Sequence, residues 1–174
     1  IKSVYERIKL FELPCERILS ILNDTFYERY YNLAIFFSCI IIDIDLEDMI
    51  LSYSNAGHPS QYLIKSNNNQ EISALSSKGK LIGSIIPYEY KKQEIKLNIN
   101  DKLVLFSDGL FEEFNEASLI FGEERLLTLI EKNKHLNVNG LSDKIYEVIT
   151  AFRGKALPHD DKTSLIIRIK GDSI

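Results

Sequence analysis

Two short acidic signatures contain the residues of this chain whose types and positions could do chemistry. Ser-Asp-Gly at 107–109 follows the apolar run 102–106, and Asp-Asp-Lys-Thr at 160–163 precedes the apolar run 164–168. Both runs are typical of buried strands, and a carboxylate at the end of such a strand is costly unless a positive charge neutralises it. Because magnesium and manganese bind aspartate oxygens, the signatures predict a metal site if the two strands are neighbours.

Each signature also has an ordinary structural interpretation that the local sequence leaves open. An Asp-Gly pair between two strands is most often a type I′ turn, although residues 110–121 do not begin a return strand. The pair Asp160-Asp161 could simply open a strand after a loop. Taken alone, therefore, neither signature decides between structure and chemistry.

Two further groups of polar residues have weaker chemical interpretations. His58, in Ala-Gly-His-Pro at 56–59, has no serine or cysteine nucleophile motif around it. A structural loop histidine is therefore favoured over a catalytic imidazole. The glutamates that follow the first signature are expected on a solvated face; they are Glu112, Glu113 and Glu116.

Length and composition exclude several classes of protein. A chain of 174 residues is expected to form one domain, and 45% hydrophobic with 26% charged residues is ordinary for a globular protein. A net charge of −4 argues against a nucleic-acid binder or a polybasic membrane binder. The longest apolar run, 33–42, is too short for a membrane span, which needs roughly 17–25 residues. With no signal peptide, and with Cys15 and Cys39 in apolar contexts, we expect buried thiols and a cytoplasmic location.

Hydrophobic periodicity predicts a mixed fold. Helices are expected over 1–11, from Pro14 past Phe26, over 122–132 and over 142–152; strands are expected over 34–43, 49–55, 61–65, 93–99, 102–108 and 163–169. Residues 72–90 are expected to be irregular. Strands in series with helices before and after predict an α+β fold of antiparallel sheets, and the lack of βαβ alternation argues against a Rossmann fold.

Three further motifs stand in order with the two signatures. They are Tyr-Ser-Asn-Ala-Gly-His-Pro at 53–59, Leu-Ile-Gly at 81–83 and Phe-Gly-Glu-Glu-Arg-Leu at 121–126. With this order and spacing the chain closely resembles the SpoIIE-like bacterial serine phosphatases. These belong to the metal-dependent protein phosphatase superfamily of the type 2C fold, and the resemblance covers nearly the whole chain.

The resemblance implies a β-sandwich of two antiparallel sheets flanked by helices. It also implies two Mn2+ or Mg2+ ions that activate water for in-line attack on a phosphoserine or phosphothreonine. Carried over residue by residue, Asp108 and Asp160 match metal-binding aspartates, and Asp161 is a further ligand or a neighbour that orients the ligands. Gly109 would let the backbone pass close to the site, while His58 would shape its loop without a chemical role.

The chain also departs from the family pattern. Two acidic motifs expected upstream, a Gly-Asp and an Asp followed by Gly-His-Gly, are not present before the first helix. We therefore expect a fragment that lacks the N-terminal strands of the sandwich and half of the metal site. The alternatives are an omission of residues or a family member that has lost catalysis. Residues 1–30 are candidates for regulatory and dimerisation helices that link the phosphatase to an upstream sensor domain.

The leading interpretation is a metal-dependent phosphatase acting on a bacterial regulatory phosphoprotein. By resemblance, the expected substrate is a STAS-type anti-sigma-factor antagonist in a partner-switching pathway, and the parent protein could be membrane-anchored through an upstream segment. The main alternative is a non-catalytic phosphatase-like module that binds such a partner. A sugar- or nucleotide-binding α+β domain is a third interpretation, supported only by the generic fold.

Overall fold

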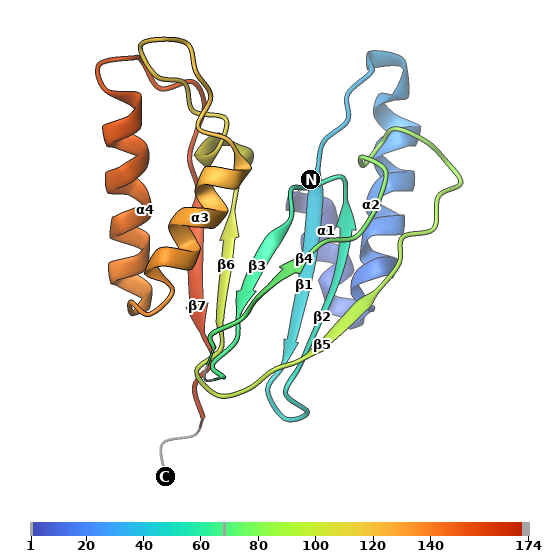
Figure 1. Cartoon of the computed structure of the whole chain (residues 1–174). Helices are drawn as coiled ribbons and strands as arrows, with labels where there is room; N and C mark the ends of the chain where they lie inside the picture. Colours follow the sequence, from blue (N-terminus) through green and yellow to red (C-terminus); the bar gives the residue numbers. More distant parts are fainter. Residues whose placement is uncertain (1, 68, 172–174) are drawn as a thin grey trace. The chain divides into compact units, whose positions relative to one another are not determined.

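The chain forms two compact units, each with its own sheet, helices and core (Figure 1). The computed structural model describes residues 2–67 and 69–171. Unit 1 consists of Ile1–Ser60 and Leu75–Leu97, and unit 2 consists of Gln61–Ala74 and Asn98–Ile174. The two signatures lie in unit 2, and His58 lies in unit 1.

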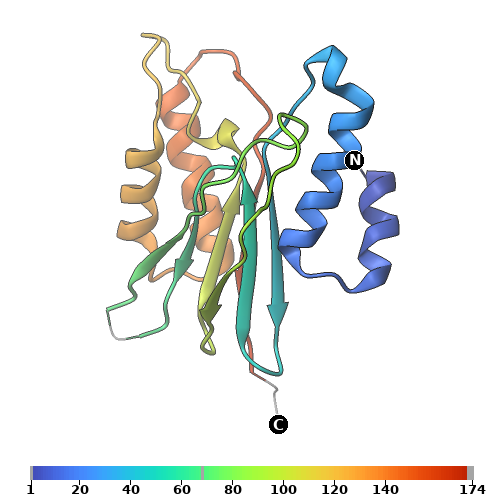
Figure 2. The same ribbon diagram turned by 90° about the vertical axis from the view of Figure 1, so that its right-hand side faces the viewer.

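In unit 1 one helix packs on a three-stranded antiparallel sheet, and a second, shorter helix packs beside it. Its helices are α1 (Lys2–Ile8) and α2 (Cys15–Tyr30), followed by the short 3-10 turns Lys9–Phe11 and Tyr31–Leu33; its strands are β1 (Cys39–Asp45), β2 (Ile50–Ala56) and β5 (Gln93–Lys96), in the order β1-β2-β5. Pro14 precedes α2, where its missing N–H costs nothing. The predicted α2 face of Ile18, Leu22 and Phe26 is buried, and Figure 2 shows α1 and α2 side by side.

Unit 2 packs two helices on a four-stranded antiparallel sheet (Figure 1). Its elements are β3 (Gln61–Ile64), β4 (Ile72–Leu75), β6 (Lys102–Phe106), the 3-10 turn η3 (Asp108–Leu110), α3 (Glu123–Asn133), α4 (Val138–Arg153) and β7 (Ser164–Arg168), and the strand order is β4-β3-β6-β7. Leu126 and Ile130 of α3 and Ile145 and Ile149 of α4 are almost fully buried in one apolar cluster. The apolar stripe of each helix therefore forms the core against the sheet.

The structure confirms the α+β class with antiparallel sheets and corrects some of the predicted boundaries. Residues 34–38 are not part of the first strand, because Ala34 has a φ of +51° and ends a 3-10 turn. Strand β4 lies in the segment expected to be irregular; only four residues long, it follows a loop closed by the Lys65 N–H donating to the Glu71 carbonyl at 2.8 Å. Helix α4 begins earlier than predicted, since the Asn137 side chain accepts from the Gly140 N–H at 2.8 Å and caps it.

Both cysteines are free thiols. The sequence predicted that both would be buried, which is confirmed for Cys15 and only in part for Cys39. Cys15 is buried and Cys39 is half-buried. Burial raises the pKa of the Cys15 thiol to about 12 and that of the Cys39 thiol to about 11. Thiols with such pKa values stay protonated at neutral pH and are poor nucleophiles. In the part of the chain that the structure describes, no helix has the length and apolar content needed to cross a membrane.

Gly79 lets the long 76–92 loop of unit 1 lie directly on the end of β2. A Cβ atom at this position would lie 1.8 Å from the Asn55 carbonyl oxygen, a backbone atom that cannot rotate away. The loop is also held by the hydroxyl of Tyr90, which donates to the Lys80 carbonyl at 3.0 Å.

We expect Gly79→Ala to destabilise the protein by about 1–3 kcal/mol, because the loop or the strand must move to relieve the overlap. Urea unfolding followed by circular dichroism measures the difference. Gly140→Ala is the control, because a Cβ there meets its nearest atom, Asn137 Oδ1, at 3.4 Å and alanine favours a helix. Equal stability of Gly79→Ala and the wild type would show that the loop is not clamped on β2.

Candidate active site

The pairing of β6 with β7 brings the two acidic signatures together at one end of the unit 2 sheet. Phe106, the last residue of β6, is opposite Ser164, the first residue of β7. Beyond this pair the Ser107 N–H donates to the Thr163 carbonyl at 3.0 Å, and the Thr163 N–H donates to Ser107 Oγ at 3.1 Å. The condition on which the predicted metal site depended, that the two strands are neighbours, is therefore met.

The Asp-Gly pair is not a hairpin turn. Asp108 begins the 3-10 turn η3, in which its carbonyl accepts the N–H groups of Phe111 at 3.0 Å and Glu112 at 2.9 Å. Gly109 lies against the second signature, since a Cβ there would be 2.3 Å from the Asp161 carbonyl oxygen and 3.6 Å from the Asp160 Cβ. The turn interpretation of this pair is wrong, and the two loops approach each other closely at Gly109.

The aspartates of this end of the sheet have few partners. Asp108 is half-buried and accepts only its neighbour's N–H, from Gly109 at 3.0 Å; Asp160 is exposed and accepts the Asp161 N–H at 2.7 Å. None of Asp108, Asp160 and Asp161 forms an ion pair with a residue that the structure describes. Their oxygens are thus available, and hard carboxylate oxygens are the ligands that Mg2+ and Mn2+ prefer.

The donor chemistry at this end of the sheet fits a divalent cation, and the described residues supply part of a coordination shell. Among residues 2–67 and 69–171, no group of three or more His, Cys, Asp or Glu side chains is gathered closely enough to hold a metal ion. The assignment of Asp108, Asp160 and Asp161 as ligands therefore stays a prediction.

Glu113 is buried, contrary to the solvated face predicted for the glutamates of this segment. Its side chain is 0% exposed, in contact with the Lys162 ammonium and 3.9 Å from an Arg153 nitrogen. A carboxyl oxygen of Glu113 also accepts the His159 N–H at 3.2 Å. Two of these partners, His159 and Lys162, flank Asp160, so Glu113 holds that segment against the chain that follows Asp108.

The charge of Glu113 is stabilised by these partners. Burial alone would raise the pKa of this carboxyl, but the contact with Lys162, the His159 N–H and the charges of Lys162 and Arg153 outweigh burial and lower it. The neighbouring Glu112 is exposed, as predicted, and exposed Glu116 accepts the Lys155 N–H at 2.7 Å. No local sequence signal distinguishes Glu113 from Glu112, because the partner of Glu113 comes from a distant segment.

His58 is held in a turn of unit 1 that its own motif constructs. The Asn55 side chain accepts the His58 N–H at 2.8 Å and donates to the His58 carbonyl at 2.9 Å. Gly57 has a φ of +70°, and the His58 ring nitrogen Nδ1 lies 3.1 Å from Ser38 Oγ. These contacts agree with a loop-shaping role for His58, and its place in the family site stays a prediction.

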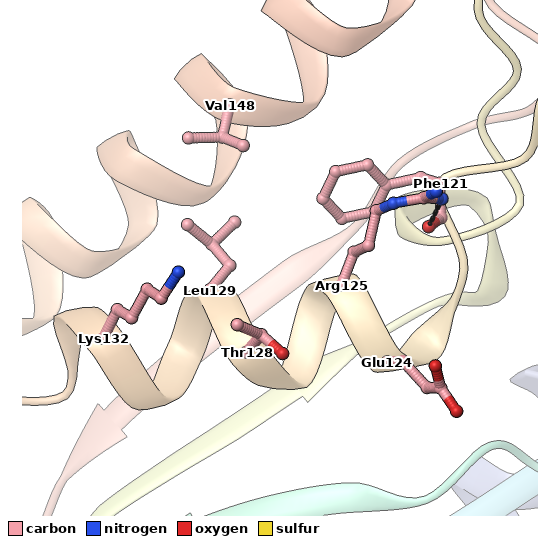
Figure 3. A pocket seen from close by; sticks show the side chains of 7 residues that line it. All are labelled: Phe121, Glu124, Arg125, Thr128, Leu129, Lys132 and Val148. Atoms are coloured by element: carbon pink, nitrogen blue, oxygen red, sulfur yellow. Dashed lines mark hydrogen bonds between the residues drawn. The ribbon is translucent and has the colours of Figure 1, made fainter.

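Arg125 of the Phe-Gly-Glu-Glu-Arg-Leu motif is used to fix the start of α3. Its guanidinium donates to the carbonyls of Ile120 and Phe121, both at 2.7 Å, and lies 5.6 Å from the ring centre of Phe152. Figure 3 shows it reaching back to Phe121 at the rim of a cavity of about 370 Å3. The cavity is lined by α3 and α4 residues, namely Phe121, Glu124, Arg125, Thr128, Leu129, Lys132 and Val148. The motif thus has a structural explanation within unit 2.

The chain matches a described family along nearly its whole length. The family model for Stage II sporulation protein E (SpoIIE) matches residues 1–170. The chain belongs to the SpoIIE family. Among curated proteins of similar sequence is the phosphoserine phosphatase RsbU of Bacillus subtilis (strain 168), which is 26% identical over 143 residues. The match covers 82% of this chain and 42% of RsbU, so the chain spans less than half the length of that relative.

Solved structures of SpoIIE-family and related phosphatases share the fold. The SiaA-PP2C domain of Pseudomonas aeruginosa superposes with a TM-score of 0.78 at 18% identity, covering 90% of this chain and 61% of that one. A structure of the PP2C phosphatase domain and a regulatory-domain fragment of Bacillus subtilis SpoIIE gives a TM-score of 0.76 at 19% identity, covering 98% and 49%. The predicted type 2C phosphatase fold is confirmed.

Proposed function

We propose that this SpoIIE-family chain is part of a metal-dependent phosphatase that hydrolyses phosphoserine or phosphothreonine on a regulatory protein. The observation that carries the proposal is the close approach of the two signatures at Gly109, which places the segments that carry Asp108 and Asp160 side by side at one end of the sheet. The similarity to RsbU, which is named a phosphoserine phosphatase, supports the reaction class.

In this proposal Asp108 and Asp160 hold a divalent cation, Mn2+ or Mg2+, with Asp161 as a further ligand or an orienting neighbour. When bound, the cations supply Lewis-acid activation of water and neutralise charge on the phosphoryl group. The rest of the local chain fixes the distance between the carboxylates. Ser107 joins the loops through its hydroxyl and amide, and Glu113 holds Lys162 and the His159 amide.

The substrate class and the partners belong to the same proposal. By family resemblance the substrate is a STAS-type anti-sigma-factor antagonist in a partner-switching pathway in the cytoplasm. Residues 1–30 would transmit a signal from a sensor domain and contribute to a homodimer. Release of phosphate from a phosphorylated STAS protein by the full-length protein, in the presence of Mn2+, tests the reaction and the substrate together.

Gly109→Ala is expected to lower the Mn2+ affinity of the full-length protein at least about tenfold, because the new Cβ must push the Asp161 backbone away. Isothermal titration with Mn2+ measures this affinity, and the phosphatase rate should fall with it. Gly140→Ala, on α4, serves as the control and should leave both unchanged. Unchanged Mn2+ affinity in Gly109→Ala would contradict the proposed dependence of the site on this close approach.

A further inference from the structure

Two positively charged side chains lie next to each other on neighbouring strands of the unit 2 sheet. Lys102, the first residue of β6, is directly opposite Arg168, the last residue of β7. Residues directly opposite in an antiparallel pair lie on the same face of the sheet, and like charges in this position are destabilising. Burial, and then the charge of Arg168, lower the pKa of the Lys102 ammonium. The pair therefore costs stability in the absence of a compensating anion.

The protein groups around this pair do not supply the missing negative charge. The buried Lys102 ammonium donates to the carbonyls of Lys134 and Leu136, which are neutral. Arg168 forms no ion pair with any residue in the described ranges. The neighbouring carboxylate, Asp101, is fully buried and already accepts from three donors: Ser66 N at 2.7 Å, Asn98 N at 3.0 Å and Lys65 Nζ at 3.3 Å.

The positive charges line a cavity. It has a volume of about 510 Å3, and Lys102 and Arg168 contribute to its wall, together with Lys65, which is paired with Asp101, and the imidazole of His135. Asn100 and Asn137 add polar groups, and Asn137 caps the N-terminus of the 16-residue helix α4, whose dipole favours an anion there. The whole chain has a net charge of −4, so this concentration of positive charge is a local feature.

We propose that this cavity binds the phosphate group of a small anion. The planar guanidinium of Arg168 can make two parallel hydrogen bonds to phosphate oxygens, and the Lys102 ammonium adds a charge that no carboxylate among the described residues compensates. The volume falls within the range of small-molecule sites, about 300–1,000 Å3, so a phosphorylated metabolite fits as well as inorganic phosphate. The cavity is at the start of β6, on the order of 20 Å along the chain from Asp108, and is a separate site that does not depend on metal binding.

Amide chemical shifts of 15N-labelled protein test the proposal without relying on activity. Divalent cations are removed with a chelator, so that phosphate cannot bind through a metal at Asp108. Inorganic phosphate and ribose 5-phosphate are titrated separately. Saturable shifts of the Ser66, Asn100 and Asn137 amides support the site. The ligand that binds more tightly shows whether the site prefers free phosphate or a phosphate ester. No shift, or a linear shift without saturation, overturns the proposal.

Arg168→Gln is the decisive variant, because it removes the exposed charge and leaves the buried Lys102 contacts in place. It should weaken binding of the tighter ligand at least about tenfold, since one or two charged hydrogen bonds are lost. Lys144→Gln, an exposed charge on α4 outside the cavity, controls for the overall charge and should bind as the wild type does. Equal weakening in both variants would mean that only the net charge matters, and unchanged binding in Arg168→Gln would exclude the proposed site.

Discussion

Replacing Asp108 with asparagine is expected to lower the proposed metal-dependent phosphatase activity of the full-length protein at least about a hundredfold. Asparagine keeps the shape of the side chain and can still accept the Gly109 N–H, which Asp108 Oδ1 accepts at 3.0 Å. The substitution removes the negative charge of the carboxylate, and a divalent cation depends on that charge more than on the shape of the side chain. Loss of a group that only orients a ligand costs roughly 10–100-fold, and loss of a ligand should cost more.

Two measurements test the assignment of Asp108 as a ligand. Hydrolysis of a generic phosphomonoester with Mn2+ gives the activity, and electron paramagnetic resonance of Mn2+ gives the bound fraction directly. Asp143→Asn, at an exposed position of α4, should match the wild type in both. If Asp108→Asn binds Mn2+ and turns over as the wild type does, Asp108 is not a ligand. A wild-type protein that binds a phosphorylated partner without hydrolysing it would favour the non-catalytic module.

Glu113→Gln should destabilise the protein by about 3–5 kcal/mol, because the ammonium of Lys162, whose side chain is only 12% exposed, would lose its buried counter-charge. Unfolding by guanidinium at neutral pH measures this loss. Glu112→Gln is a matched control one residue away, since Glu112 is exposed, and should change stability by less than about 0.5 kcal/mol. In a Lys162→Met background the cost of Glu113→Gln should be smaller; an equal cost would show that the pair is not coupled.

The same pair gives a pH dependence with a definite sign. The folded-state pKa of Glu113 lies below its ordinary value of 4.5. Its contribution to stability is therefore fully present above that value and is lost as the pH falls through the lowered folded-state pKa. The stability gap between the wild type and Glu113→Gln should accordingly narrow only below about pH 4.5. If the stability difference between the wild type and Glu113→Gln is constant from neutral to acidic pH, it comes from packing and not from the charge of Glu113.

Much of the fold could be predicted because it follows from local apolar periodicity. Pro14 and the spacing of Ile18, Leu22 and Phe26 identify α2, and the alternating run before Asn55 identifies β2. The errors fall where tertiary contacts decide. The four residues of β4 are too few to show a period, and the left-handed conformation of Ala34 could not be expected from an alanine.

Part of the candidate site could also be predicted, because its aspartates lie next to apolar runs that the sequence shows. Asp108 follows the buried strand β6, whereas Asp160 precedes β7, whose side chains are half-buried or exposed, contrary to the predicted burial. Pairing of these two apolar runs was enough to bring the segments that carry the aspartates side by side. Glu113 was misjudged because it lies in a run of acidic residues that looks solvated. Its burial depends on Lys162, which a long connection through two helices brings back beside it. Sequence periodicity carries no information about such a contact.

The register of β6 against β7 restricts where insertions and deletions can occur without loss of either site. The connection between Ser107 and Thr163 can change length within its loops and leave the paired ends in place. A single residue inserted within β7 would instead move its side chains to the opposite face. Such an insertion would separate Arg168 from Lys102 at one end of the β6–β7 pair, or change the contact between Gly109 and the Asp160 segment at the other end. One strand alignment thus governs both ends of unit 2.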